Sequence, residues 1–176
     1  MAPKTGRMAV VLPQGALFRK GAEGAIRQQL IEEDLIEAVI GLAPNIFYGT
    51  SLAPAVIFIR HRKPEARRGK IMIIDASALY RKGRAQNFLD SDHARQIAGW
   101  VKVFKDVQDR ARVVTVDEVK TEDYTLNISR YVLPPIGEDI PPLPEAVKAF
   151  KEALKEAREA EADLRKALEE GGWLNE

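Results

Sequence analysis

The sequence has 176 residues, enough for one domain with an additional segment; 45% are hydrophobic and 30% charged, an ordinary globular balance. It holds no cysteine, which excludes disulfides and thiolate metal sites, and no apolar run approaches the roughly 18 residues of a membrane helix. Residues 1–142 carry 21 Lys/Arg against 17 Asp/Glu and residues 143–176 carry 6 against 9, so a mildly basic body compatible with DNA precedes an acidic tail.

Apolar runs alternate with polar segments over residues 1–90. They predict strands at 8–12, 35–42, 55–60 and 70–75. A helix is predicted over 22–34, with Ile26, Leu30 and Ile31 on its inner face. The short basic connection between the last two strands predicts a hairpin. The fold class is therefore α/β, an open sheet with an antiparallel edge, occupying residues 1–90.

Residues 91–132 are predicted to form a helical and extended connecting region. A helix begins at Ser91–Asp92, and Thr115 with Glu118 has the pattern of a capping box that starts a short helical turn. Residues 124–132 are expected to be extended. The inner face of the first helix is formed by apolar residues at helical spacing, Ile97, Trp100, Val101, Phe104 and Val107.

Five prolines mark residues 133–144 as a stiff linker. An amphipathic helix is predicted over 145–172, with an end at Gly171–Gly172. Its apolar seam, which starts in the linker, has the spacing of a heptad repeat and is broken only by Glu161. Such a helix is hard to bury against a small sheet, so we expect it to dock on a partner through Leu143, Val147, Phe150, Leu154, Leu164 and Leu168.

Few residues point to catalysis. The stretch GRMAVVLPQGALFRKGAEGAIRQQL (6–30) has the layout of a nucleotide-binding loop, but neither G-x-G-x-x-G nor G-x-x-x-x-G-K-[ST] follows its strand. Asp75 sits at a strand end, where catalytic acids and capping residues both occur. His93 is expected to be solvated, and two histidines leave little room for a metal site. We therefore assign no catalytic residue and no metal ligand.

Two loops have both a structural and a functional interpretation. The basic loop 60–70 is either a solvated hairpin or a set of contacts to DNA phosphates through Arg62, Lys63, Arg67 and Arg68. The loop APNIFYGTSLAP (43–54) presents Phe47 and Tyr48 between two buried strands. An aromatic side chain there is either a hydrophobic plug or a platform on which a base stacks.

Together these segments resemble the modification subunit of type I restriction–modification systems, an adenine-N6 DNA methyltransferase. The resemblance covers about residues 6–132. It rests on the strand-turn-helix of Val10–Phe18 with Gly21, Glu23, Ile26 and Arg27, on the loop 42–50, on the strands at 55–60 and 70–75, and on YTLNISRY (124–131). Thr125, where the family prefers Asn, and Ala43, within the usual Leu-Pro, depart from its pattern.

The resemblance implies the second half of a Rossmann-like methyltransferase sheet. The family binds S-adenosylmethionine through D-P-x-x-G-x-G and holds the flipped adenine with N-P-P-[FY], and both motifs are absent here. We therefore expect a C-terminal portion of a modification subunit that does not methylate DNA alone and binds the cofactor poorly. Phe47, with Tyr48 as the alternative, is the residue expected to stack on the target adenine.

The resemblance also implies partners: DNA, the specificity subunit and the restriction subunit, in the cytoplasm, with no membrane. The alternative is a non-enzymatic module that docks or oligomerises through the heptad helix. In either case, an open sheet edge and the apolar seam predict self-association of the chain as a dimer. The DNA recognition sequence is expected to be read by the specificity subunit.

Overall fold

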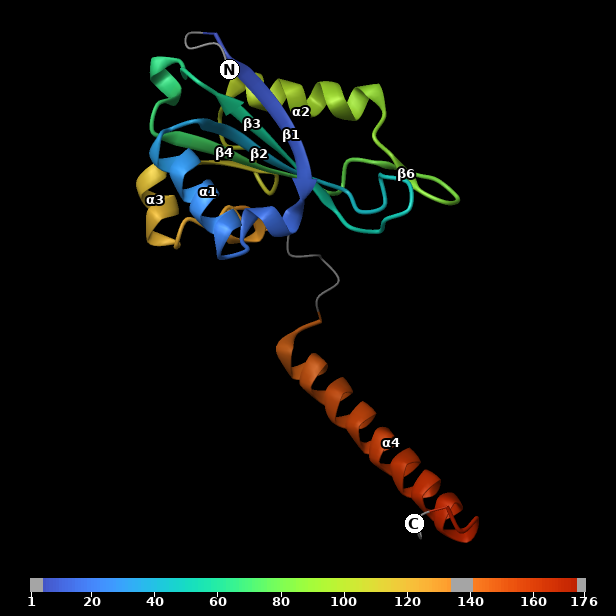
Figure 1. Cartoon of the computed structure of the whole chain (residues 1–176). Helices are drawn as coiled ribbons and strands as arrows, with labels where there is room; N and C mark the ends of the chain where they lie inside the picture. The colour runs from blue at the N-terminus through green and yellow to red at the C-terminus, as the bar shows by residue number, and fades with distance from the viewer. Residues whose placement is uncertain (1–4, 134–140, 174–176) are drawn as a thin grey trace. The chain divides into compact units, whose positions relative to one another are not determined.

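The chain forms two units, Met1–Pro135 and Ile136–Glu176, in the computed structural model shown in Figure 1. The structure describes residues 5–133 and 141–173. The first unit is an α/β sheet with its helices, and the second is a long helix. Residues 134–140 of the predicted linker lie outside the described residues.

A five-stranded mixed sheet organises the first unit. The order is β1-β3-β2-β4-β7, in which β2 and β4 are parallel and all other neighbours are antiparallel. The central strand β2 is buried along its whole length, which is why its sequence is a nearly continuous apolar run. The strands are β1 (Arg7–Pro13), β2 (Ile36–Leu42), β3 (Pro54–Arg60), β4 (Lys70–Ala76) and β7 (Ala111–Thr115).

The four strands predicted from the sequence are confirmed to within two residues, but one pairing was wrong. β3 and β4 do not form a hairpin, because β2 lies between them. The basic loop therefore crosses the end of β2. The small antiparallel hairpin is instead β5 (Arg81–Lys82) with β6 (Asn87–Phe88), and β7 was not predicted.

Helices cover both faces of the sheet. α1 (Ala22–Glu32) and α3 (Val116–Thr121) contribute to one apolar cluster, and α2 (Ser91–Val103) contributes to the other. The predicted cap of α3 is confirmed, since Thr115 Oγ1 accepts a hydrogen bond from the Glu118 N–H at 3.1 Å. α2 ends before Phe104, which adopts a left-handed conformation (φ 55°), so Phe104 and Val107 lie beyond the helix that was expected to include them.

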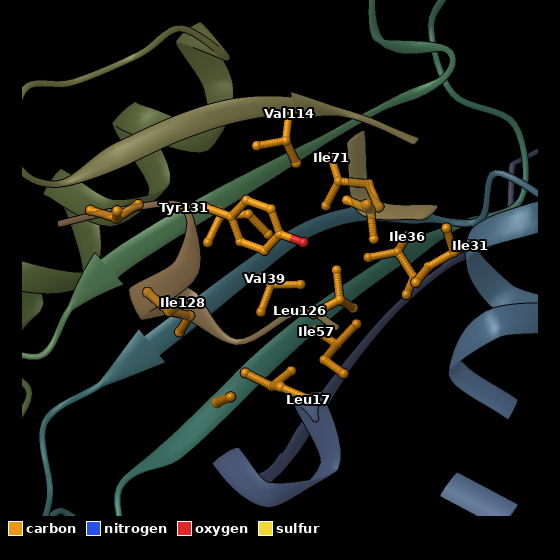
Figure 2. Packing of buried hydrophobic residues seen from close by; sticks show 14 of the residues in the cluster. Leu17, Ile31, Ile36, Val39, Ile57, Ile71, Val114, Leu126, Ile128 and Tyr131 are labelled. Carbon is orange, nitrogen blue, oxygen red and sulfur yellow. The ribbon is translucent and has the colours of Figure 1, made fainter. Parts of the chain in front are cut away.

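The cluster on the α1 side is completed by the end of the first unit (Figure 2). Residues 124–132 were expected to be extended, but they form turns and a 3₁₀ helix, Ile128–Arg130. This bent path places Leu126, Ile128 and Tyr131 in the core. The Tyr131 hydroxyl donates to the Thr125 carbonyl at 2.6 Å, and burial raises the pKa of Tyr131 to about 12.

The second unit is α4 (Leu143–Glu170), coloured orange to red in Figure 1. The helix starts two residues before the predicted position, behind Pro142, and its C-cap is Gly171, as expected. None of its residues is buried. In the ranges that the structure describes, no helix is both long and apolar enough to cross a membrane.

Candidate functional site

The loop between β2 and β3 is anchored at its beginning by the β5–β6 hairpin. The Asn87 N–H donates to the Asn45 carbonyl at 2.7 Å, and Asn87 Nδ2 donates to the Pro44 carbonyl at 2.8 Å. Ile46 packs against the apolar cluster on the α2 side. The next two side chains are not buried. Asn87 and Ile46 thus fix the start of the aromatic pair.

Phe47 and Tyr48 have different surroundings. Phe47 is 44% exposed and lines a hollow of about 390 Å³, whereas Tyr48 is 93% exposed and does not line it. The chain then turns at Gly49 (φ 76°), and Thr50 Oγ1 accepts from the Leu52 N–H at 3.1 Å. The hollow is lined by Val11, Leu12, Pro13, Phe47, Thr50, Leu52, Ala53 and Pro54.

The hollow can bind a flat apolar face but offers few polar contacts. Its lining contains no charged side chain, and its volume lies within the range of about 300–1,000 Å³ typical of small-ligand sites. Pro13 and Pro54 face one another where the β1–β3 ladder ends, and neither residue has an N–H to donate. Sequence reasoning named Phe47, which lines the hollow, but not Val11 of the edge strand β1 or Leu52, because their places in this lining depend on long-range pairing.

The basic loop lies at the other end of β3. β3 has 7 residues rising about 3.3 Å each, so this loop and the Phe47 loop are separated by roughly 20 Å. Lys63 is buried and contacts Asp34, and Arg67 donates to Glu37 at 2.8 Å and stacks on Phe104.

These internal contacts leave Arg62 and Arg68 as the exposed members of the predicted phosphate-binding set. Phosphate contact by this loop therefore stays a prediction that concerns Arg62 and Arg68 foremost.

The other polar candidates have local structural roles. Asp75 Oδ1 accepts from the Ser77 N–H at 2.9 Å, which caps the turn after β4. His93 Nδ1 accepts from the Asp90 N–H at 3.2 Å at the start of α2. No group of three or more His, Cys, Asp or Glu residues that could hold a metal ion occurs within residues 5–133 and 141–173.

The predicted docking residues all belong to α4. Five of them are exposed, and Leu168 is partly covered. They form an apolar stripe along the helix, which is interrupted at Glu161. The six residues are Leu143, Val147, Phe150, Leu154, Leu164 and Leu168.

Known proteins include relatives of this chain. The model of the N-6 DNA methylase family matches residues 1–139. The methylase subunit of the type I restriction enzyme MjaVIII from Methanocaldococcus jannaschii is 40% identical over 136 residues, which are 76% of this chain and 23% of the relative. The chain thus spans about a quarter of the length of the curated relatives it matches.

Solved structures show the same fold. The methyltransferase subunit of a type I restriction–modification system from Streptococcus thermophilus is 41% identical, with a TM-score of 0.68 over 73% of this chain and 27% of that one. A chain from a structure on assembly of the type I system, 22% identical, covers 97% of this chain and 37% of its own length with a TM-score of 0.59, which shows the fold alone.

The expected fold class, an α/β methyltransferase-type sheet followed by a C-terminal helical region, is confirmed by the match to the Streptococcus thermophilus subunit. The mixed sheet, the aromatic loop at its end and the match over residues 1–139 lead to the same conclusion. The chain belongs to the N-6 DNA methylase family and, within it, resembles the methylase subunits of type I restriction–modification systems.

Proposed function

We propose that this chain is part of a DNA adenine-N6 methyltransferase of a type I restriction–modification system and supplies one wall of the pocket for the target base. The observation that carries the proposal is the position of Phe47, half-exposed over an apolar hollow at the end of β1 and β3. A base removed from the duplex needs a surface on which to stack, because it has lost its neighbours in the helix.

The anchoring of the loop supports Phe47 over Tyr48 as the stacking residue. Asn87 and Ile46 hold the residues just before Phe47, so its ring is presented with little freedom to lose on binding. Tyr48 lies outside the hollow.

The methyl donor in such an enzyme is S-adenosylmethionine, and the hollow beside Phe47 does not fit it. The hollow beside Phe47 has no carboxylate to accept hydrogen bonds from ribose hydroxyls and no glycine-rich turn. The chain's role in methyl transfer is therefore to position the base, and the chain alone is expected to give no turnover.

The test is Phe47→Ala within a complete methylase subunit that contains this segment. Stacking is worth about 1–3 kcal/mol per base, so methylation of site-containing DNA with labelled S-adenosylmethionine should fall roughly 5- to 150-fold. Phe47→Tyr should retain most of the rate. Tyr48→Ala is the matched control and should change the rate less than twofold.

If Phe47→Ala and Tyr48→Ala lower the methylation rate equally, or if Phe47→Ala does not lower it, Phe47 acts as a hydrophobic plug and not as the stacking residue. Thermal unfolding of each variant separates a lost contact with the base from a damaged fold. A drop in the rate with an unchanged melting temperature supports the stacking role.

A second function, favoured by the exposed apolar stripe of α4, is subunit docking. The specificity subunit and the restriction subunit of a type I complex are the proposed partners. Self-association of the chain through α4 is the other way in which this apolar stripe could be covered. The outer side of the edge strand β1 is a second surface through which two copies could pair.

A further inference from the structure

The two flanks of the α4 seam differ in composition. The residues that follow the seam positions Phe150, Ala157 and Leu164 are Lys151, Arg158 and Arg165, so three successive helical repeats have a cation on one side of the stripe. The residues that precede Val147, Leu154, Glu161 and Leu168 are all alanine, so the other side is small and apolar. These flanks are the positions whose charges select partners in coiled coils.

Among the residues that the structure describes, two of the three cations beside the seam, Lys151 and Arg158, lack the ion pairs that the lysines on the outer face form. Lys148, Lys155 and Lys166 point away from the seam, and each pairs with the glutamate four residues later at 3.6–4.0 Å. Within residues 141–173, Lys151 and Arg158 form no ion pair, and Arg165 meets Glu169 at 3.5 Å.

This arrangement disfavours pairing of α4 with a second copy of itself. In a parallel pair, Glu161 would face Glu161 inside the seam, and the cationic flank would face alanines, so no flanking ion pair would form. In an antiparallel pair, the cationic flanks would face each other. Glu161 also has no ion pair in the described part of α4 and would remain uncompensated in an apolar seam.

We propose that α4 docks on an amphipathic helix of a different polypeptide, whose flank carries carboxylates facing Lys151, Arg158 and Arg165 and which places one cation opposite Glu161. The alanine flank leaves room for the partner backbone to approach closely. This inference rests on the proposed docking role of α4 and specifies the chemistry of its partner.

The test uses the full 176-residue chain and two designed helices with identical apolar seams. Both place a lysine opposite Glu161; one has glutamate on both flanks, and the other has lysine on both flanks. Titration followed by Trp173 fluorescence should show about tenfold tighter binding of the acidic-flanked helix, with the preference declining as NaCl rises.

A triple variant, Lys151→Glu, Arg158→Glu and Arg165→Glu, should reverse the preference. The matched control, Lys148→Glu, Lys155→Glu and Lys166→Glu, makes the same change in net charge away from the seam. It should keep the preference for the acidic-flanked helix. Equal binding of both helices by the native chain would overturn the inference and leave docking intact. Binding of neither helix would overturn the docking role itself. Circular dichroism confirms that each variant retains its helix.

Glu161→Leu provides a separate test of partner choice. Completing the apolar seam should allow α4 to pair with itself, so sedimentation equilibrium should show self-association at least tenfold tighter than in the native chain. Glu159→Leu, on the outer face of the same turn, should leave the mass distribution unchanged. If Glu161→Leu behaves like the native chain, Glu161 does not limit self-pairing and the argument for a different partner fails.

Discussion

Replacing Arg27 by Met is expected to lower the free energy of unfolding of the sheet unit by about 3 kcal/mol, because it leaves three partly buried carbonyl oxygens without their donor. Arg27 is only 6% exposed. Its Nε donates to the Tyr124 carbonyl at 2.8 Å, and its Nη1 donates to the carbonyls of Ala16 and Arg19 at 2.9 and 3.0 Å. Methionine fills a similar volume but donates nothing.

These three bonds join segments that are distant in the sequence. Arg27 is on α1, Ala16 and Arg19 belong to the turn after β1, and Tyr124 begins the segment that carries Leu126 and Tyr131 into the core. Burial lowers the pKa of Arg27 from its ordinary value, but an arginine stays protonated across the usable pH range. The guanidinium therefore links these segments by hydrogen bonds across the whole usable pH range.

Urea denaturation followed by Trp100 fluorescence measures the loss. Arg19→Met is the matched control, because the Arg19 side chain is 61% exposed and meets Glu23 at 3.7 Å; we expect a change within about 0.5 kcal/mol. Arg27→Lys keeps the positive charge but has fewer N–H donors, so its loss of unfolding free energy should lie between those of Arg27→Met and Arg19→Met. An unchanged urea midpoint in Arg27→Met would show that water satisfies the three carbonyls.

α1 shows why such a residue escapes prediction from the sequence. Apolar spacing placed Ile26, Leu30 and Ile31 on the inner face, yet Ile26 is 61% exposed and Arg27 shares the buried side with Ile31. The apolar spacing of a helix indicates its period but not which polar side chain will bind groups on other segments. The three carbonyls that accept from Arg27 belong to segments outside α1, so the sequence of α1 does not indicate them. The role of Arg27 is therefore to make tertiary contacts.

The same limit separates what was predicted of the sheet from what was not. Runs of Val and Ile were sufficient to place β1 to β4, because strand formation depends on local composition. The order of the strands depends on pairing between distant segments, so β3 and β4 were paired wrongly. Residues 124–132 resembled a strand locally, but the hydrogen bond from the Leu126 N–H to the Leu17 carbonyl directs them across the sheet instead.

For the candidate site, the sequence indicated the loop but not its support. Two adjacent aromatics between apolar runs marked Phe47 and Tyr48, and the structure distinguishes them by the hollow that only Phe47 lines. The anchor Asn87 is 40 residues beyond Phe47 in a short hairpin without a strong pattern of its own. In the basic loop, composition suggested four equivalent cations, whereas Lys63 and Arg67 are bound internally.

Asp34→Asn is expected to lower the free energy of unfolding by about 2 kcal/mol at pH 7, since it removes the only carboxylate that contacts the buried Lys63 ammonium within the described residues. Lys63 Nζ meets Asp34 Oδ1 at 2.6 Å and the Lys70 carbonyl at 2.7 Å. Asp34 Oδ2 also accepts from the Gly69 N–H at 3.0 Å. The single oxygen of asparagine can serve one of these donors but not both, while its tolerance of φ 54° avoids backbone strain.

The cost of Asp34→Asn should shrink as the pH rises from 7 to 10. Burial lowers the pKa of Lys63 and the Asp34 carboxylate opposes that shift, so removing the charge lowers the folded-state pKa further while the unfolded-state value stays near 10.5. Between those two values the unfolded chain binds more protons than the folded one, and stability rises with pH. The difference in urea midpoint between variant and native protein should therefore narrow.

Asp123→Asn is the matched control for this experiment. Asp123 also has a left-handed backbone, with φ 55°, and meets Lys20 at 3.0 Å, but the two side chains are 78% and 87% exposed. Asp123→Asn should change the free energy of unfolding by no more than about 0.5 kcal/mol at either pH. A loss in Asp34→Asn that is the same at pH 7 and pH 10 would mean that Lys63 keeps its proton without the carboxylate, and the basic loop would then be held by hydrogen bonds rather than by charge.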